Sequence, residues 1–209
     1  VARTFGQFAD DVAAHLAVEV SGGRDRWLIL KVATLLHDVA KPATRSVDED
    51  GHIRFDNHEL VGAKMAAARM GDLRFSGNET DRVRTIIGAH SRLSHLAKAD
   101  EVTRRAVYRF FRATSCGGVD VALLCLADHL AAWGPNLREQ RWARRLDVAE
   151  TLLAHWFERY EETVCPVTLI TGDDLMTELG LAPGPKIGRL LEAVREAQAA
   201  MRLNPFDPG

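Results

Sequence analysis

Several features of other protein classes are missing from this 209-residue sequence, and each absence narrows the possible function. The three cysteines, Cys116, Cys125 and Cys165, form no Cys-x-x-Cys pair, and their number is odd. No signal-peptide pattern and no apolar run of transmembrane length is present. We therefore expect reduced, buried thiols, a cytoplasmic location and no membrane partner.

Strong charge of one sign is also missing. Lys and Arg total 27 against 29 Asp and Glu, a net charge of −2, which argues neither for a polyanion-coating protein nor for an acidic tail. Internal repeats and low-complexity segments are absent. The 46% apolar and 27% charged residues are typical of a globular domain with a real core. Because the chain begins at Val1 and not at Met, we expect a piece of a longer protein.

What is present is a helical period along nearly the whole chain, which predicts an all-α fold. The expected helices cover residues 2–20, 25–40, 57–72, 78–90, 100–115, 118–133, 136–163, 171–180 and 185–201. One exception is residues 44–55, where Asp50-Gly51 between two short runs predicts a β-hairpin. Pro166 suggests a boundary between a domain at 1–165 and a C-terminal helical hairpin at 166–209. Thr171 would cap the first helix of that hairpin, and Pro185 would start the second.

The stretch "LLHDVAKP", residues 35–42, places His37 and Asp38 in the last turn of an apolar helix that Pro42 stops. A carboxylate there faces the negative end of the helix dipole and needs a partner. A bound divalent cation is one answer, because imidazole and carboxylate both bind metals. The alternative is a salt bridge from Asp38 to Lys41 or to an arginine.

A second acid without an evident partner is Asp128 in "VDVALLCLADHLAAW", a helix that is apolar on every face and is therefore expected to be buried. It could pair with an arginine or share a metal with Asp38. His58 opens a predicted helix and His90 ends one, so either could complete that site or lie on the surface. Four other histidines suit it less, being placed on a turn, a loop or helix surfaces: His52, His95, His129 and His155.

Basic residues gather between residues 82 and 112, with eight Lys or Arg against two acids. Arg105, Arg109 and Arg112 share one helical face, and a similar row follows on the next long helix at Arg138, Arg141 and Arg145. Such rows could contact an RNA backbone or could pair with acidic side chains on a solvated face. Lys186 in "PGPKIG" could contact a phosphate at a helix start, although ordinary capping explains it equally well. The tryptophans are expected in the core: Trp27, Trp133, Trp142 and Trp156.

Together, "LKVATLLHDVAKPATRSVDEDGHIRFDNHELVGAKM", "RRAVYRFFRATSCGGVDVALLCLADHLAAWGP" and "DLMTELGLAPGPKIGRLLEAVREAQAA" carry a family resemblance. They resemble the HD superfamily of metal-dependent phosphohydrolases, and within it the HD-containing C-terminal region of bacterial tRNA nucleotidyltransferases and poly(A) polymerases. The resemblance covers residues 24 to 201. It implies a helical HD bundle with a small β-hairpin insertion and a C-terminal helical hairpin.

The resemblance also implies a site and a reaction. His37 and Asp38 match the signature pair, Asp128 matches the distal aspartate, and His58 and His90 match additional metal-binding histidines. Lys41 matches a lysine that could meet a substrate phosphate, so Asp38 and Lys41 are the expected catalytic residues. The implied cofactor is a divalent ion, and the ligand set admits Mg, Mn, Fe, Ni, Co or Zn. The implied reaction is hydrolysis of a phosphate ester of a nucleotide or RNA end.

Two departures from the family pattern stand out. The family has a further metal-binding histidine upstream, for which His15 is the one candidate, and Ala89 stands before His90 where relatives often have paired histidines. The sequence also lacks a Gly-rich turn leading to a strand with Asp-x-Asp. We therefore expect no nucleotidyltransferase active site in this chain and a missing N-terminal domain in the longer protein.

Three hypotheses about function follow. The first is a metal-dependent phosphohydrolase with RNA, in particular tRNA, or small nucleotides as its partner. The second is a non-catalytic RNA-binding body in which the HD residues are remnants and Arg105, Arg109, Arg112, Arg141 and Lys186 bind the RNA. The third is a structural scaffold in which His37, Asp38 and Asp128 form ion pairs. Metal content separates the first hypothesis from the others.

Overall fold

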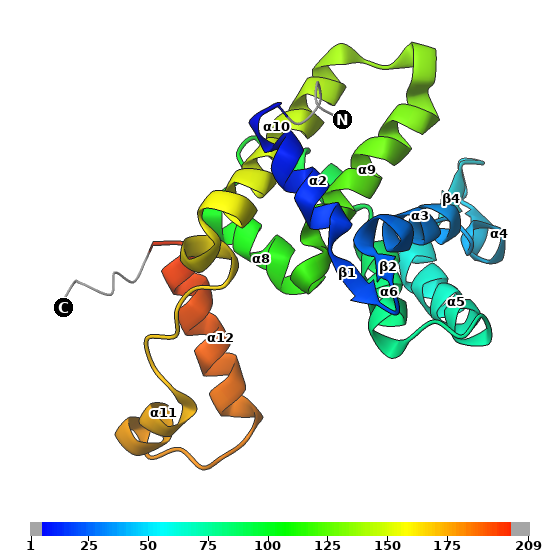
Figure 1. Cartoon of the computed structure of the whole chain (residues 1–209). Coiled ribbons are helices and arrows are strands. Elements are labelled where there is room, and N and C mark those ends of the chain that lie inside the picture. Colours follow the sequence, from blue (N-terminus) through cyan, green and yellow to red (C-terminus); the bar gives the residue numbers. More distant parts are fainter. Residues whose placement is uncertain (1–5, 202–209) are drawn as a thin grey trace.

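The structure is a computed structural model and describes residues 6–201. It is built almost entirely from helices, as predicted, with two small antiparallel hairpins (Figure 1). The elements in chain order are η1 (Gly6–Phe8), α2 (Ala9–Ala17), β1 (Glu19–Ser21), β2 (Arg24–Asp25), α3 (Arg26–Leu36), α4 (Lys41–Thr44), β3 (Arg45–Val47), β4 (Ile53–Phe55), α5 (His58–Asp72), α6 (Gly77–Ala89), α7 (Arg92–Leu96), α8 (Arg104–Thr114), η2 (Ser115–Gly117), α9 (Gly118–Trp133), η3 (Gly134–Asn136), α10 (Glu139–Glu158), η4 (Tyr160–Val164), α11 (Gly172–Leu179) and α12 (Pro185–Ala199).

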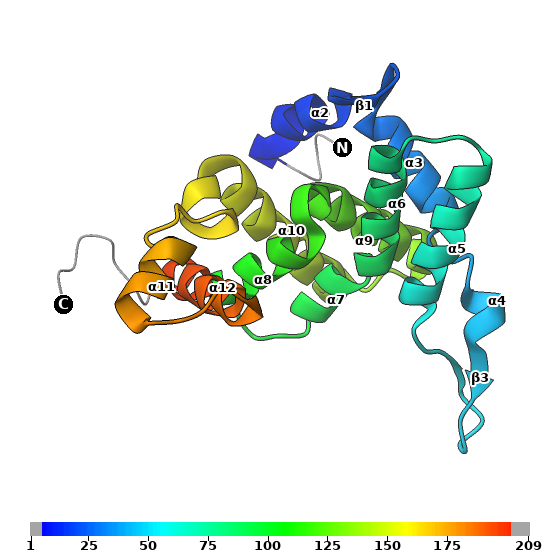
Figure 2. The same cartoon turned by 90° about the horizontal axis from the view of Figure 1, so that it is seen from below.

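The hairpin predicted between residues 44 and 55 is present. Strands β3 and β4 pair antiparallel from Arg45 opposite Phe55 to Val47 opposite Ile53, and Gly51 has a φ of +81° in the turn. The hairpin projects away from the helices and adds nothing to their core (Figure 2).

A second hairpin, β1–β2, was not predicted, because the first helix was expected to run on to residue 20. The helix ends at Ala17 instead. Gly22 and Gly23 have φ values of +58° and +77°, and two consecutive residues with positive φ match the twist of a tight hairpin. The two glycines therefore make a strand connection and do not simply end a helix. The start of the expected helix, residues 2–5, lies outside the described residues.

The core is centred on α9, which packs against α6, α8 and α10. Its first half is buried nearly all round, as its apolar composition predicts. Gly118 starts this helix in direct contact with α8, since a Cβ there would lie 2.5 Å from ring atoms of Phe111. Asp120 is also buried in α9, and the sequence analysis passed over it.

One stretch among the described residues, Arg104–Asn136, is long and apolar enough to cross a membrane by length and composition, which the sequence analysis did not expect. It contains both α8 and α9, and 67% of its most apolar window is buried inside the protein. The helices of a protein core have the same composition, so this observation is weak support for a membrane span.

Several expected core residues are on the surface. Trp27 and Trp133 are 45% and 42% exposed, whereas Trp142 and Trp156 do pack against the core. The three cysteines are free, as expected, but Cys125 alone is buried. Cys116 and Cys165 lie at or beyond the ends of helices, where a short apolar stretch need not face the core.

The C-terminal hairpin of α11 and α12 extends from the rest of the chain (Figures 1 and 2). Thr171 caps α11 in a reciprocal capping box with Asp174, and Pro185 is the first residue of α12, both as predicted. Helix α12 lies against α8 and η4. The division into domains at residue 166 stays a prediction.

Candidate metal centre

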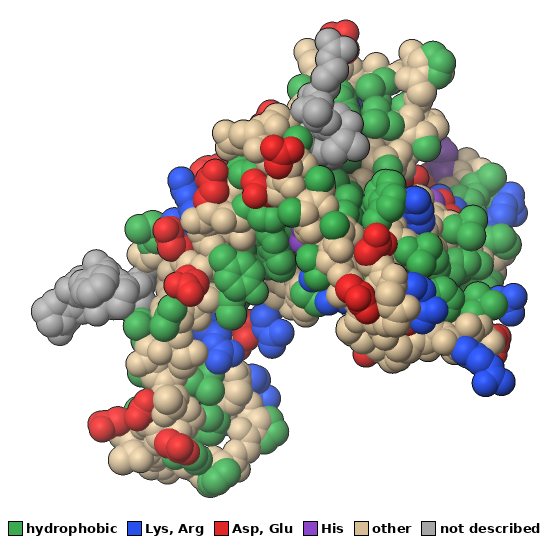
Figure 3. Space-filling view, in the orientation of Figure 1, with side chains coloured by type: hydrophobic (Ala, Val, Ile, Leu, Met, Phe, Trp, Pro, Cys, Tyr) green, Lys and Arg blue, Asp and Glu red, His purple; other side chains and the backbone are tan. Residues whose placement is uncertain are grey.

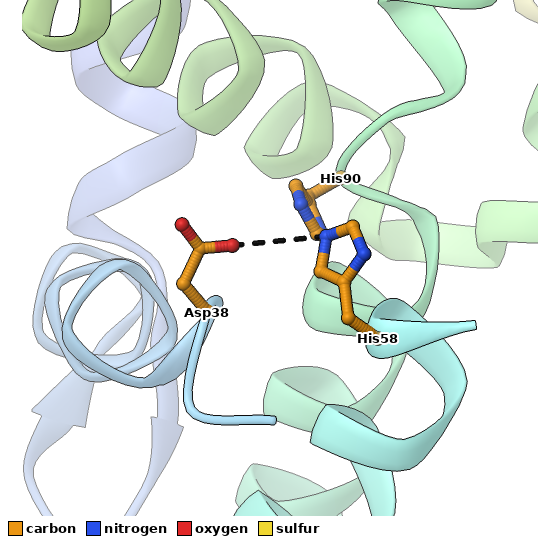
Figure 4. Close-up of side chains that lie close together, drawn as sticks. All are labelled: Asp38, His58 and His90. Carbon is orange, nitrogen blue, oxygen red and sulfur yellow. Dashed lines mark ion pairs between the residues drawn. The ribbon is translucent and has the colours of Figure 1, made fainter. Parts of the chain in front are cut away.

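Five side chains that the sequence analysis selected lie together where four helices meet. His37 and Asp38 follow the end of α3, His58 is the first residue of α5, His90 follows the end of α6, and Asp128 lies in the last turns of α9. Figure 4 shows Asp38, His58 and His90 pointing toward one another from three separate segments.

The five residues form two adjoining groups that share Asp38. One group is Asp38, His58 and His90, and the other is His37, Asp38 and Asp128. Within each group, one ligand atom per residue lies within 4.8 Å of the others. Oδ1 of Asp38 is 3.7 Å from Nε2 of His58, and Oδ2 is 3.2 Å from Nε2 of His37. A carboxylate placed in this way can bridge two metal ions.

All three histidines make the same hydrogen bond to the backbone. In each, Nδ1 lies 2.7 to 2.8 Å from the carbonyl oxygen of the residue three positions earlier. A carbonyl oxygen only accepts hydrogen bonds, so Nδ1 carries the proton and the neutral ring has its lone pair on Nε2. The bonds are His37 to Thr34, His58 to Phe55 and His90 to Ile87. Metal-binding histidines are typically oriented by a hydrogen bond of this kind from the other ring nitrogen.

Two buried polar atoms of the cluster lack hydrogen bonds. Nε2 of His37 and Oδ1 of Asp38 are out of contact with solvent and have no partner of acceptable geometry. A buried polar atom without a partner is unfavourable by about 1–3 kcal/mol. Oδ1 of Asp38 faces His58, and Nε2 of His37 faces Asp128. A cation in each ligand group would therefore satisfy one of these atoms, and the residues present fit divalent metal ions.

The side chains of the cluster shift one another's pKa values. The Asp128 carboxylate, 3.4 Å from Nε2 of His37, raises the pKa of His37 against the effect of burial. His37 in turn lowers the pKa of Asp128. Burial lowers the pKa of His90, which is 6% exposed. The favourable effect of a helix C-terminus on a protonated histidine is therefore outweighed at His90.

Lys41 lies beside the cluster, with Nζ 2.6 Å from Oδ2 of Asp38. This is the salt bridge that the sequence analysis weighed as the alternative to a metal. It engages Oδ2 alone and leaves Oδ1, which faces His58, without a hydrogen bond. The salt bridge and a metal site are therefore compatible. Lys41 is 39% exposed, so its amine can also reach a ligand from solvent.

Asp128 is less buried than expected. Its side chain is 43% exposed, because α9 leaves the core in its last turns. The buried acid of α9 that pairs with an arginine is Asp120, whose Oδ2 lies 3.7 Å from Nη1 of Arg26. The arginine pairing that the sequence suggested for Asp128 is thus made by an acid two turns earlier in α9.

The other histidines fall into two sets. His52 and His95 are exposed, as expected, but His129 and His155 are buried and not on helix surfaces. His129 stacks on Trp142, with ring centroids 6.2 Å apart, and Nδ1 of His155 donates to Thr163. Both histidines lie on the inner face of a long helix, α9 or α10, and the sequence alone did not indicate that this face is buried.

His15, the candidate for an upstream metal ligand, is committed elsewhere. Nη1 of Arg26 donates to its Nε2 at 2.9 Å, and the same nitrogen lies 3.4 Å from Asp120. His15 belongs to none of the ligand groups found in residues 6–201. The cluster around Asp38 therefore has His37, His58 and His90 as its histidines.

Glu59 is a neighbour of the cluster that the sequence analysis did not select. Its Oε2 lies 3.5 Å from Nδ1 of His58. Although burial acts to raise the pKa of Glu59, hydrogen bonds to backbone and to Ser91 outweigh it and lower that pKa. The signal for Glu59 in the sequence was its position directly after His58.

The residues predicted to bind RNA have different surroundings. Arg105 and Arg109 pair with Glu196, and Arg112 pairs with Glu192, so α12 covers this face of α8. Figure 3 shows basic and acidic side chains meeting where the C-terminal hairpin joins the body. Arg141 is exposed on α10, and Lys186 is exposed at the start of α12. RNA binding by these five residues stays a prediction.

Three oriented imidazoles and two carboxylates, brought together by packed helices, are typical of helical proteins that bind divalent metal ions. A model of the HD domain family matches residues 1–133. The chain therefore belongs to the HD domain family.

Two curated relatives were found over most of the chain. An A-adding tRNA nucleotidyltransferase of Deinococcus radiodurans is 36% identical over 84% of this chain, and a CC-adding tRNA nucleotidyltransferase of Thermus thermophilus is 34% identical over 83%. This chain spans 38% and 36% of the lengths of those proteins.

Proposed function

We propose that this domain is a metal-dependent phosphohydrolase that acts on phosphate esters of nucleotides or RNA ends. The observation that carries the proposal is the common orientation of His37, His58 and His90. Each donates Nδ1–H to the carbonyl oxygen three residues earlier, and each thereby presents the lone pair of Nε2 to the cluster around Asp38. A structural scaffold needs no such repeated orientation.

The residues of the chain have separate tasks in this proposal. The three histidines with Asp38 and Asp128 would hold one or two divalent ions. A bound ion would polarise a phosphoryl oxygen and lower the pKa of a water molecule near it. Asp38 belongs to both ligand groups and would accept the proton of that water. Lys41, now paired with Asp38, can reach a phosphate oxygen of the substrate from its half-exposed position.

The relatives support a tRNA-related setting for this reaction. Their names specify addition of A or CC to tRNA, and this chain corresponds to less than two fifths of each. We propose that the chain is a part of a protein of that kind, with the nucleotide-adding active site on a further domain. tRNA is then the RNA partner to test first.

The metal content of the purified chain tests the proposal. After incubation with a set of divalent ions and desalting, we expect about one or two ions per chain, as in other mononuclear and dinuclear hydrolases. Asp128→Ala removes a ligand and should lose the ion, whereas Asp81→Ala, an exposed aspartate outside the cluster, should keep it. Hydrolysis of a 3′-phosphorylated oligoribonucleotide should require the ion and be lost in Asp38→Asn.

A non-catalytic RNA-binding body is the second candidate. It is favoured by the pairing of Asp38 with Lys41 and by the contact of His37 with Asp128, since these pairs balance charge without an ion. Absence of retained metal in both the parent chain and Asp81→Ala, together with tRNA binding, would support this candidate and contradict the hydrolase.

A further inference from the structure

A basic pocket lies between α7 and α10. Its volume is about 390 Å³, and its polar lining consists of six side chains. They are Ser94, Lys98, Gln140, Arg141, Arg144 and Arg145. Four of the six are cations and none is an acid, so the pocket has a concentrated positive charge.

The charge of this pocket is not balanced by neighbouring side chains. Among residues 6–201, none of the four cations has a carboxylate within 4.0 Å. Arg144 donates to the carbonyl oxygens of Ala99 and Asp100, and Arg145 donates to that of Arg141. Nε of Arg145 is buried and has no hydrogen-bond partner. Cations held this close repel one another, and a bound anion would offset that repulsion.

The pocket is joined to the metal centre by short connections. Ser94 comes four residues after His90, and its Oγ lies 3.2 Å from Sγ of Cys125 on α9. Asp128 follows Cys125 by about one helical turn. Through Ser94, the α7 wall of the pocket is thus close to His90 along the chain and touches α9 about one turn before Asp128, which suits a ligand that contacts both places.

We propose that this pocket binds a backbone phosphate of an RNA strand whose terminal phosphate ester reaches the metal centre. The role in the reaction rests on the proposed function, but binding by the pocket does not. A strand is preferred over a single nucleotide because the exposed Arg138, the residue just before α10, adds a further cation three positions before Arg141. An extended row of cations follows successive phosphates along a backbone.

Binding of a fluorescent single-stranded oligoribonucleotide to the whole chain tests this inference. The measurement is made in chelator, so that the metal centre makes no contribution. The test variant is Lys98→Gln with Arg141→Gln, because both side chains are exposed and neither makes a hydrogen bond within the described residues. We expect about tenfold weaker binding and a salt dependence shallower by about 1.4, or 0.7 for each lost contact.

A matched control keeps the result specific. Arg69→Gln with Arg84→Gln removes the same charge from exposed positions on α5 and α6, outside the pocket, and should bind nearly as the parent chain does. Equal loss in control and test variants would overturn the proposal, as would no loss in either. If AMP displaces the fluorescent strand as well as an unlabelled oligoribonucleotide does at the same concentration, the choice of an RNA strand is overturned.

The same variants separate this inference from the proposed function. If the pocket variant binds weakly but no chain hydrolyses RNA with any metal, the pocket stands and the hydrolase fails. If hydrolysis requires the metal but the pocket variant has an unchanged KM, the hydrolase stands and the pocket fails.

Discussion

Two rows of arginines with the same helical spacing have opposite surroundings in this protein. On α8, Arg105 and Arg109 meet Glu196 of α12, and Arg112 meets Glu192. On α10, the row that includes Arg141 has no acidic partner among residues 6–201, and it lines a pocket. The spacing of basic residues thus identifies a charged face, but the element packed against that face decides whether the charge is available to a ligand.

Burial of the acid decides how much each pairing contributes to stability. Glu192 and Glu196 are 31% and 19% exposed, and they pair with arginines that are largely exposed. At the other extreme, Glu79 is fully buried under Arg24, which donates to its two oxygens at 2.5 and 2.9 Å. The contrast between these arginine environments leads to four predictions.

The largest effect on stability is expected at Glu79. Glu79→Gln should lower the free energy of unfolding at pH 7 by about 2 kcal/mol, less than for a fully buried pair because Arg24 is 37% exposed. Urea unfolding measures this change. Asp81→Asn, which removes the partner of the exposed Arg84, is the control and should leave stability nearly unchanged.

The contribution of Glu79 should also depend on pH. Its hydrogen bonds with Arg24 lower the pKa of Glu79 from 4.5 to about 2 in the folded state. Since the folded pKa is below the unfolded one, the stabilisation is complete above pH 4.5 and is lost as the pH falls toward 2. The difference in stability between the parent chain and Glu79→Gln should therefore shrink at pH 3. The same difference at pH 7 and pH 3 would contradict this account.

Freeing the row on α8 should make it resemble the row on α10. Glu192→Gln with Glu196→Gln removes the partners of three arginines and should cost only about 1 kcal/mol of stability, because the pairs are partly exposed. Oligoribonucleotide binding should strengthen, with a salt dependence steeper by about 2 if all three contact phosphate.

The matched control for that change is Asp72→Asn with Asp81→Asn. It alters the net charge equally but frees one arginine on each of two other helices. If it strengthens binding as much as the glutamate substitutions do, the effect comes from net charge, and the row on α8 is not a binding surface.

The smallest effect is expected from Arg105→Gln with Arg109→Gln in the parent chain. Both guanidinium groups already contact Glu196, so an RNA strand must displace that contact. Binding should weaken by less than the loss caused by Lys98→Gln with Arg141→Gln in the same assay. A larger loss would show that the C-terminal hairpin opens to admit RNA, and it would support the sequence-based prediction for these arginines.

Much of the candidate metal centre could be predicted before the structure. His37-Asp38 at the end of an apolar helix and Asp128 late in another are positions where a charge needs a partner. His58 and His90 at predicted helix ends were candidates to complete the site, and the HD resemblance matched them to metal-binding histidines. The structure brings all five together. The sequence could not reveal the shared Nδ1 hydrogen bonds, because they depend on the backbone conformation where each helix begins or ends.

The errors have a common physical origin. His129 and His155 are buried and Trp27 and Trp133 are exposed, in each case because neighbouring helices determine which face of a long helix is covered. Asp120 was overlooked in an apolar stretch because its partners, Arg26 and His15, lie on two other helices and are distant in sequence. The β1–β2 hairpin was missed because two glycines end a helix or join two strands equally well in sequence.

By itself, the sequence determined the helical fold, the β3–β4 hairpin, the cap at Thr171 and the start of α12 at Pro185. These depend on periodicity and local backbone preferences, which neighbouring residues set. Only the tertiary structure decided which charges stay free. Carboxylates of α12 reach the arginines of α8, and no acidic side chain reaches Arg141 among the described residues. An ion pair needs two groups within a few ångströms, and segments distant in sequence meet at that range only after the helices have packed.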